Sequence, residues 1–297
     1  MLKAINTKIL ISGITILAAA ALAIGGTFAW FSDTETSKGN VLAAGAIDLK
    51  IDNESYVTNP ETGKLMASED TSWDLRDLTF EKFFNFEDLK PGDIGEDTIS
   101  IHVDSNDAWL CAAARVTVNS DETCTEPENT DEAGACVVET DGINGDLAKE
   151  VNFAFWKDDG DNVLETNEAQ GIFLAGPISG LGTDGQIALA DSTGGPLGPG
   201  PVEGGVTHYI GKGWCFGTPN PTPEIQDGLG KTNPNTNGPL VRGPGFTCDG
   251  SDVDNKAQTD KVVGDLQFYA VQSRNNPDFE CDADEGGYTP VWPSPTP

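Results

Sequence analysis

The segment Ile99-Ser100-Ile101-His102-Val103 shows the pattern that decides the fold of this chain. Its apolar and polar side chains alternate, so an extended strand would place all the apolar ones on one face. The same alternation recurs at residues 47–52, 112–119, 151–155 and 266–270, and more weakly at 171–175 and 206–216. One apolar and one polar face is typical of antiparallel strands. Several such strands separated by turn residues predict an all-β sandwich or barrel.

Helical periodicity is weak in this sequence. The best helix candidate is residues 73–86, WDLRDLTFEKFFNF, whose apolar side chains fit a short amphipathic helix that leads into a strand. The sequence leaves the end of this helix ambiguous. The core is therefore expected to come almost wholly from strands.

The N-terminus has the three parts of a secretory signal peptide. Lys3 and Lys8 precede an apolar and small-residue run at 9–24, and Thr27-Phe28-Ala29 supplies the small residues that a signal peptidase requires. We therefore expect residues 1–29 to be removed by cleavage between Ala29 and Trp30, and the mature chain to be secreted. The alternative is a retained membrane anchor, but this run is short for a spanning helix of roughly twenty residues.

The mature chain is strongly acidic. After the signal, 15 basic residues remain against 48 acidic ones, a formal charge of −33. Such a surface repels nucleic acid and anionic membranes, so we expect no nucleic acid partner, and membrane contact only through an uncleaved signal. The surface attracts divalent cations, although ordinary solvated carboxylates account for most of this charge.

All six cysteines lie in the exported part: Cys111, Cys124, Cys136, Cys215, Cys248 and Cys281. An even number in an oxidising compartment predicts three disulfides, but it leaves the pairing open. A Cys124–Cys136 bond would close a polar insertion, and a Cys215–Cys248 bond a Pro/Gly-rich one. Closing a loop of about thirteen residues stabilises by roughly 3 kcal/mol in the chain-entropy model.

Three stretches are interpreted as insertions into a single β domain that spans residues 30–281. They lie at about 120–145, 177–205 and 218–260, and they are acidic or rich in glycine and proline. None has enough apolar residues for a core of its own, so we expect disulfide-pinned loops. Residues 282–297 are expected to form an acidic and then Pro-rich extended tail.

Four segments, in order along the chain, resemble the TasA/camelysin family. The junction GGTFAWFSDTET, residues 25–36, is similar to the site that a SipW-type signal peptidase cuts in that family. Residues 39–49, GNVLAAGAIDL, resemble the family's first strand. Leu89-Lys90-Pro91-Gly92-Asp93 resembles the loop before its next strand, and LQFYAVQ at 266–272 is similar to its closing strand.

The resemblance implies a jelly-roll-like antiparallel β-sandwich at the cell surface or in the extracellular matrix. It also implies the structural subunit of a filament, such as a biofilm matrix fibre or an archaeal bundling pilus. In such fibres the freed N-terminal segment of one subunit completes the sheet of the next. Transferred to this chain, residues 30–46 are the donor strand, with Trp30, Phe31, Val41 and Leu42 as its apolar anchors. The implied partners are copies of the same chain, head to tail, and a SipW-type signal peptidase.

The physics of sheet edges supports donor-strand exchange. An open edge presents unpaired N–H and C=O groups, and a neighbour's strand can pair with them. Head-to-tail pairing of this kind continues from copy to copy, so it makes filaments rather than rings. The alternative is that residues 30–46 stay as an edge strand of their own subunit.

The acidic segment WKDDGDNVLETNE, residues 156–168, is the best metal candidate. After a turn at Gly160, oxygen ligands fall at alternate positions, and a further carboxylate is able to complete the shell. These ligands are Asp159, Asp161, the Val163 carbonyl, Glu165 and Glu168. Hard oxygen ligands at this spacing suit Ca²⁺. The alternative is an acidic hairpin turn without a metal, because Asp-Gly is a common strand connector.

Catalytic motifs are lacking. The sequence has two histidines, His102 and His208, with no His-Glu-x-x-His and no Gly-x-Ser-x-Gly motif. Camelysin-type relatives have been classed as metallopeptidases, but no ligand set for one is recognisable, so we expect no enzyme activity. The leading hypothesis is a filament subunit. A monomeric secreted adhesin or carbohydrate-binding module is the alternative, and a camelysin-like metallopeptidase comes third.

Overall fold

The computed structural model describes most of the chain after residue 31. The described residues are 32–36, 41–42, 47–104, 106–131, 136–138, 145–181, 185–231, 234–282 and 287–292. The expected signal peptide, the Ala29–Trp30 junction and Phe31 lie outside them. No helix among the described residues has the length and apolar character needed to cross a membrane.

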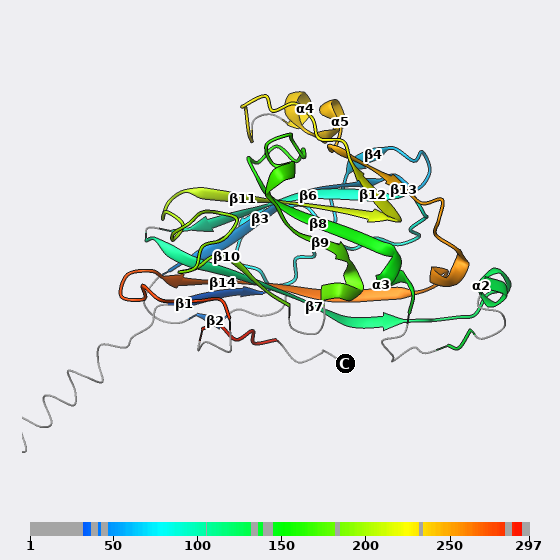
Figure 1. Cartoon of the computed structure of the whole chain (residues 1–297), viewed down its shortest axis with the longest axis horizontal. Coiled ribbons are helices and arrows are strands. Elements are labelled where there is room, and N and C mark those ends of the chain that lie inside the picture. Colours follow the sequence, from blue (N-terminus) through cyan, green and yellow to red (C-terminus); the bar gives the residue numbers. More distant parts are fainter. Residues whose placement is uncertain are drawn as a thin grey trace, which may run out of the picture.

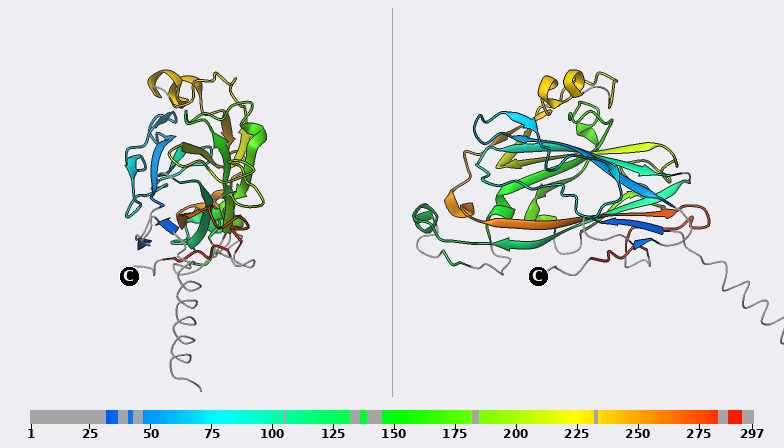
Figure 2. Two further views of the ribbon diagram at one scale, coloured as in Figure 1. Left: turned by 90° about the vertical axis from the view of Figure 1, so that its left-hand side faces the viewer. Right: turned by 180° about the vertical axis from the view of Figure 1, so that it is seen from behind.

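Two antiparallel sheets stack face to face (Figures 1 and 2). The first has the strand order β10 (Gly185–Ala190), β7 (Ala108–Ser120), β14 (Lys261–Gln272), β1 (Ser32–Thr36) and β2 (Val41–Leu42). The second has the order β4 (Leu65–Ala67), β3 (Leu49–Thr58), β6 (Ile94–Val103), β11 (Thr207–Phe216), β8 (Val151–Asp158) and β9 (Ile172–Pro177), and β5 (Trp73–Arg76) also pairs with β3. The predicted all-β sandwich is confirmed.

The core between the sheets follows the alternation seen in the sequence. Ile99, Ile101 and Val103 of β6 are buried, and β7 and β14 contribute their own alternate residues to the same cluster. These are Leu110, Ala112 and Ala114 from β7, and Leu266, Phe268 and Ala270 from β14. The period-two pattern therefore identified the buried face of each long strand.

The helix predicted for residues 73–86 is wrong. Residues 73–76 form strand β5 on the edge of β3, and the rest of the segment is irregular. Trp73 packs against Phe83 with ring centroids 4.9 Å apart, and Leu78 is fully buried. The apolar side chains thus reach the core singly from an irregular segment, so their spacing in the sequence only imitated a helical face.

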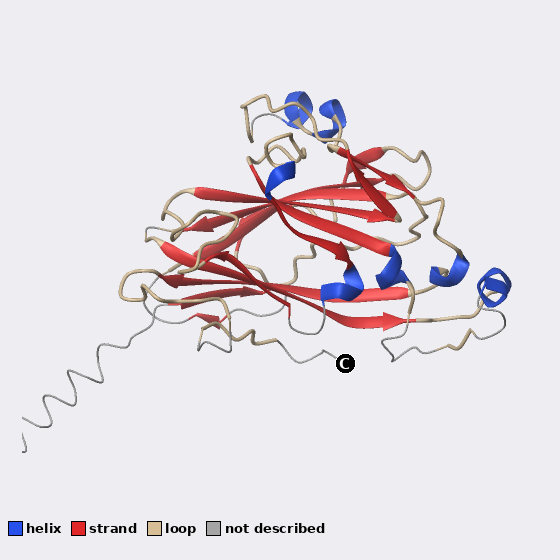
Figure 3. Cartoon of the chain, in the orientation of Figure 1, coloured by secondary structure: helices blue, strands red, loops and turns tan. Residues whose placement is uncertain are grey.

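The helices within the described residues are short (Figure 3). They are α2 (Glu126–Asp131), α3 (Leu147–Glu150), α4 (Pro234–Asn237), α5 (Pro239–Arg242), and the 3₁₀ turns η1 (Ala169–Gly171), η2 (Ile178–Leu181) and η3 (Asn255–Ala257).

The expected loop at 177–205 is partly wrong, because it contains strand β10. This strand pairs with β7 and extends the first sheet. The insertion at 218–260 contains the small sheet β12 (Thr218–Pro221) and β13 (Phe246–Asp249), as well as α4 and α5. In Figures 1 and 2, α4 and α5 lie on the far side of the second sheet from the first. The insertion is therefore a second layer over that sheet.

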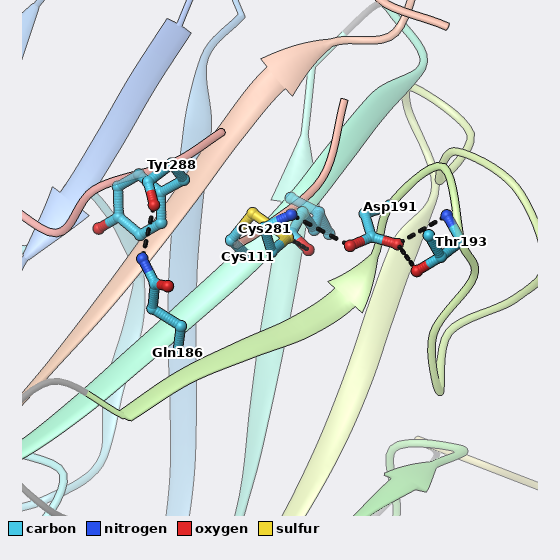
Figure 4. Close-up of a disulfide and its surroundings, with 7 residues drawn as sticks. Cys111, Gln186, Asp191, Thr193, Cys281 and Tyr288 are labelled. Atoms are coloured by element: carbon cyan, nitrogen blue, oxygen red, sulfur yellow. Dashed lines mark hydrogen bonds between the residues drawn. A yellow bond between two sulfur atoms is a disulfide. The ribbon is translucent and has the colours of Figure 1, made fainter. Parts of the chain in front are cut away.

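All six cysteines are paired. The bonds are Cys111–Cys281, Cys124–Cys136 and Cys215–Cys248. The last two are the loop closures that the sequence suggested. The first joins β7 to the segment that follows β14, and Figure 4 shows its surroundings.

The C-terminal segment packs against the first sheet over its described part. Tyr288 is buried and stacks on Tyr269 of β14, with ring centroids 4.4 Å apart. Gln186 donates a hydrogen bond to the backbone carbonyl of Tyr288, and Trp292 lies 4.5 Å from the guanidinium of Arg115. Residues 287–292 therefore cover the outer face of the first sheet, which the low complexity of the segment concealed.

Candidate functional site

The acidic loop begins where β8 ends, and hydrogen bonds to the carboxylate of Asp158 fix its first turn. Asp158 accepts hydrogen bonds from the hydroxyl of Thr98 at 2.8 Å, the backbone N–H of Gly160 at 2.9 Å and the indole of Trp156 at 3.2 Å. Gly160 has a φ of 107°, a value that favours glycine, and this allows the sharp turn. The loop is thereby fixed to the end of the second sheet.

Three of the predicted ligands converge in this loop. One oxygen each from Asp159, Asp161 and Glu165 lies within 4.8 Å of the other two. Oxygens that share a Ca²⁺ ion at 2.3–2.6 Å have separations in this range. Asp161 and Glu165 are buried, with 5% and 0% of their surface exposed.

Glu168 and Val163 play other parts in this arrangement. The Glu168 carboxylate accepts the backbone N–H of Asp159 at 2.9 Å and that of Glu165 at 3.1 Å, so it organises the loop backbone. The side chain of Val163 is fully buried, and its N–H donates to Asp161 at 2.9 Å. Glu168 does not belong to the three-carboxylate grouping.

The insertion closes the site with groups that sequence reasoning missed. The guanidinium of Arg242, at the end of α5, lies 2.5 Å from an oxygen of Asp161, 2.5 Å from one of Glu165 and 3.2 Å from one of Asp227. Asn237 of α4 also donates to Asp161, at 3.3 Å. A signal was present in the sequence, because Arg242 is the only arginine in the acidic 218–260 stretch.

The carboxylates of the loop carry more negative charge than the single guanidinium balances. Burial, reinforced by the neighbouring Asp158, raises the pKa of Asp161 to about 8 and that of Glu168 to about 9. Among the described residues, no donor reaches Oε2 of Glu165 or Oδ1 of Asp159, although both atoms are buried. The site therefore favours a proton or a cation.

The two histidines cannot share one metal ion. In the register of β6 and β11, His102 pairs with Thr207, and His208 pairs with Ile101, so the two imidazoles point to opposite faces of the sheet. His102 lies 3.1 Å from the Thr207 hydroxyl, and His208 lies 3.4 Å from the Glu203 carbonyl. No metal-binding grouping among the described residues includes a histidine.

The N-terminal strand β1 lies between β14 and the two-residue edge strand β2 in its own sheet. Ser32 to Thr36 pair antiparallel with Val271 to Gln267 of β14, and the two residues of β2 pair back onto β1. The expected anchors Val41 and Leu42 thus form β2, while Trp30 and Phe31 lie outside the described residues.

The camelysin metallo-endopeptidase family matches residues 4–98, which include β1 to β5 and the first half of β6. Over these residues the chain is similar to the camelysin/TasA family. No curated protein and no solved structure matched the chain. The camelysin/TasA region contains neither histidine nor cysteine. The acidic loop, the 218–260 insertion and all three disulfides lie outside it.

Proposed function

We propose that this protein is exported, cleaved between Ala29 and Trp30, and assembled as the structural subunit of an extracellular filament or matrix fibre. In this assembly, β1 leaves its own sheet and pairs with β14 of the next copy. The proposal rests on the camelysin/TasA match and on the position of β1.

The position of β1 is the observation that carries the proposal. The order of the first sheet places β1 and β2 outside β14, whose other neighbour is β7. Removing β1 therefore leaves the β7–β14 pairing intact. It exposes the N–H and C=O groups of β14 along residues 267–271, where a strand from another copy can make the same ladder.

Hydrogen bonds alone give the same free energy whether β1 pairs within its own subunit or with the next copy. Exchange replaces the β1–β14 ladder of one subunit by an equal ladder between two, so the hydrogen bonds are conserved. At high local concentration, mass action and any additional contact between subunits then favour the exchanged form. Because each subunit both donates and accepts, the chain of exchanges continues into a filament.

The register gives a direct test. Asp33 lies opposite Ala270, and opposed residues in a ladder are close enough for a disulfide. Mature protein carrying Asp33→Cys and Ala270→Cys should give a ladder of covalent oligomers on a non-reducing gel, as well as filaments by electron microscopy. The two single variants, which keep the three native disulfides, are the controls and should give no ladder.

A covalent bond formed only within single chains, in protein that never forms filaments, would contradict the proposal and favour the monomeric adhesin or carbohydrate-binding module. A second arm uses protein that lacks residues 30–46. This variant should stay monomeric and bind a synthetic peptide of residues 30–46.

The family description also raises a metallopeptidase as a second function. Cleavage of a protein substrate that a chelator abolishes, in preparations free of filaments, would support it. The absence of histidine and cysteine from the matched region and the opposed histidines both argue for the structural role.

A further inference from the structure

We propose that Asp159, Asp161 and Glu165 bind a Ca²⁺ ion, and that Asp227 of the 218–260 insertion belongs to the same site. The ion would join the acidic loop to the insertion that covers the second sheet. This inference is independent of filament assembly.

The available oxygens define the position of the ion. Arg242 occupies Oδ2 of Asp161 and Oε1 of Glu165. The buried atoms Oε2 of Glu165 and Oδ1 of Asp159 have no donor among the described residues. These oxygens are therefore free to bind a cation while the guanidinium keeps its own contacts.

Burial makes the unpartnered oxygens significant. Glu165 is fully buried, and a buried charged oxygen without a partner is costly to a fold. One guanidinium contacts three carboxylates, while Asp158 and Asp159 add further negative charge. A divalent cation supplies the missing charge and the missing ligand at the same point.

The ligand chemistry selects Ca²⁺. The grouping offers only carboxylate oxygens, which are hard ligands, and it contains no imidazole or thiolate. The loop is irregular and held by backbone hydrogen bonds to Glu168, which suits the flexible geometry of Ca²⁺ better than the strict octahedron of Mg²⁺.

The ion would reinforce contacts that already cross between the loop and the insertion. Gln226 donates to Asp159 at 3.2 Å, and the backbone N–H of Asp227 donates to Glu165 at 3.3 Å. Backbone bonds also link Thr166 to Glu224 and Leu164 to Pro244. Calcium should therefore stabilise the insertion more than the rest of the molecule.

The test uses full-length mature protein stripped with chelator. Saturating Ca²⁺ should raise its Tm by roughly 5 °C or more, and Mg²⁺ should raise it less. Tb³⁺ should show emission on excitation of tryptophan, because Trp156 is hydrogen-bonded to Asp158 beside the site, and Ca²⁺ should quench it by displacement. Hydrogen exchange should slow at residues 224–229 when Ca²⁺ is added.

The variants Asp159→Asn and Glu165→Gln keep the shape of the side chains and remove one charge each. Both should lower Ca²⁺ affinity at least about tenfold, while their Tm in chelator stays equal to that of the parent or rises. The matched control is Asp252→Asn, which removes an exposed carboxylate from a different turn and should leave the Ca²⁺ response unchanged.

Three results would overturn the proposal. The first is a chelated parent whose Tm does not respond to Ca²⁺. The second is an equal response to Mg²⁺, which would indicate screening of a diffuse acidic surface. The third is an unchanged Tb³⁺ signal in Glu165→Gln, which would place the ion elsewhere.

Discussion

The two sheets each carry a second layer on their outer face, and these layers are built differently. Residues 279–282 and 287–292 cover the first sheet with aromatic side chains, including Phe279 and Tyr288, and the Cys111–Cys281 bond holds the first of these segments there. Residues 218–231 and 234–249 cover the second sheet, held by Cys215–Cys248, with a small apolar cluster around Phe246 and a larger polar part.

The two layers differ in whether their buried groups need a partner from solution, such as a proton or a cation. The aromatic layer needs no ion or proton to be stable, because its stacked rings carry no charge that requires a partner. The polar layer brings Asp161, Glu165 and Asp227 around one arginine and leaves buried oxygens without donors. We therefore expect the first layer to be insensitive to ions and pH, and the second to depend on both.

The largest effect should come from opening the aromatic layer. The Cys111–Cys281 bond spans 170 residues, so replacing both cysteines by alanine should lower the free energy of unfolding by roughly 5 kcal/mol in the chain-entropy model. Amide exchange should accelerate at residues 279–292. The matched control is Cys124→Ala with Cys136→Ala, which removes a disulfide between cysteines only 12 residues apart. This variant should lower the free energy of unfolding by about 3 kcal/mol. Equal losses for the two pairs would refute the role given to the long closure.

A smaller loss of stability is expected from displacing Trp156, which belongs to the apolar cluster around Phe246. Gly211 of β11 faces the ring of Trp156, and an added Cβ would lie 2.2 Å from it. Gly211→Ala should therefore destabilise by about 1–3 kcal/mol in chemical denaturation, because the indole must move. Gly180→Ala is the control, since a Cβ there has no atom within 4 Å. A neutral Gly211→Ala would show that the indole is not tightly held.

The smallest effect should be a gain in stability that depends on pH. Glu96 is fully buried beside Gly213, and burial, with nearby carboxylates, raises its pKa well above 4.5. The folded form holds the proton, so this residue costs stability as the pH rises above about 4.5. Glu96→Gln should raise the Tm at pH 7 and leave it unchanged at pH 4. The exposed Glu61→Gln is the control, and a gain at both pH values would exclude titration as the cause.

The strands were predictable because their signal is local. Each of β3, β6, β7, β8 and β14 places one face in the core, and this leaves alternation within a few consecutive residues. β10 was missed, since a strand in a Gly/Pro-rich stretch is defined by its pairing with β7 rather than by its own side chains. The helix prediction for residues 73–86 was wrong for the opposite reason. The apolar side chains of this segment reach the core singly, and their spacing in the sequence resembled a helical face.

The sequence by itself determined the antiparallel strands, the even number of cysteines and the clustering of carboxylates after β8. Only the tertiary structure decided that Arg242, 77 residues after Glu165, closes that cluster and that β1 and β2 lie outside β14 in the first sheet. Local patterns record which face of a strand is buried. They do not record where a distant loop will pack, because that depends on the space left by glycines such as Gly211 and Gly213 on a sheet that forms only when the whole chain folds.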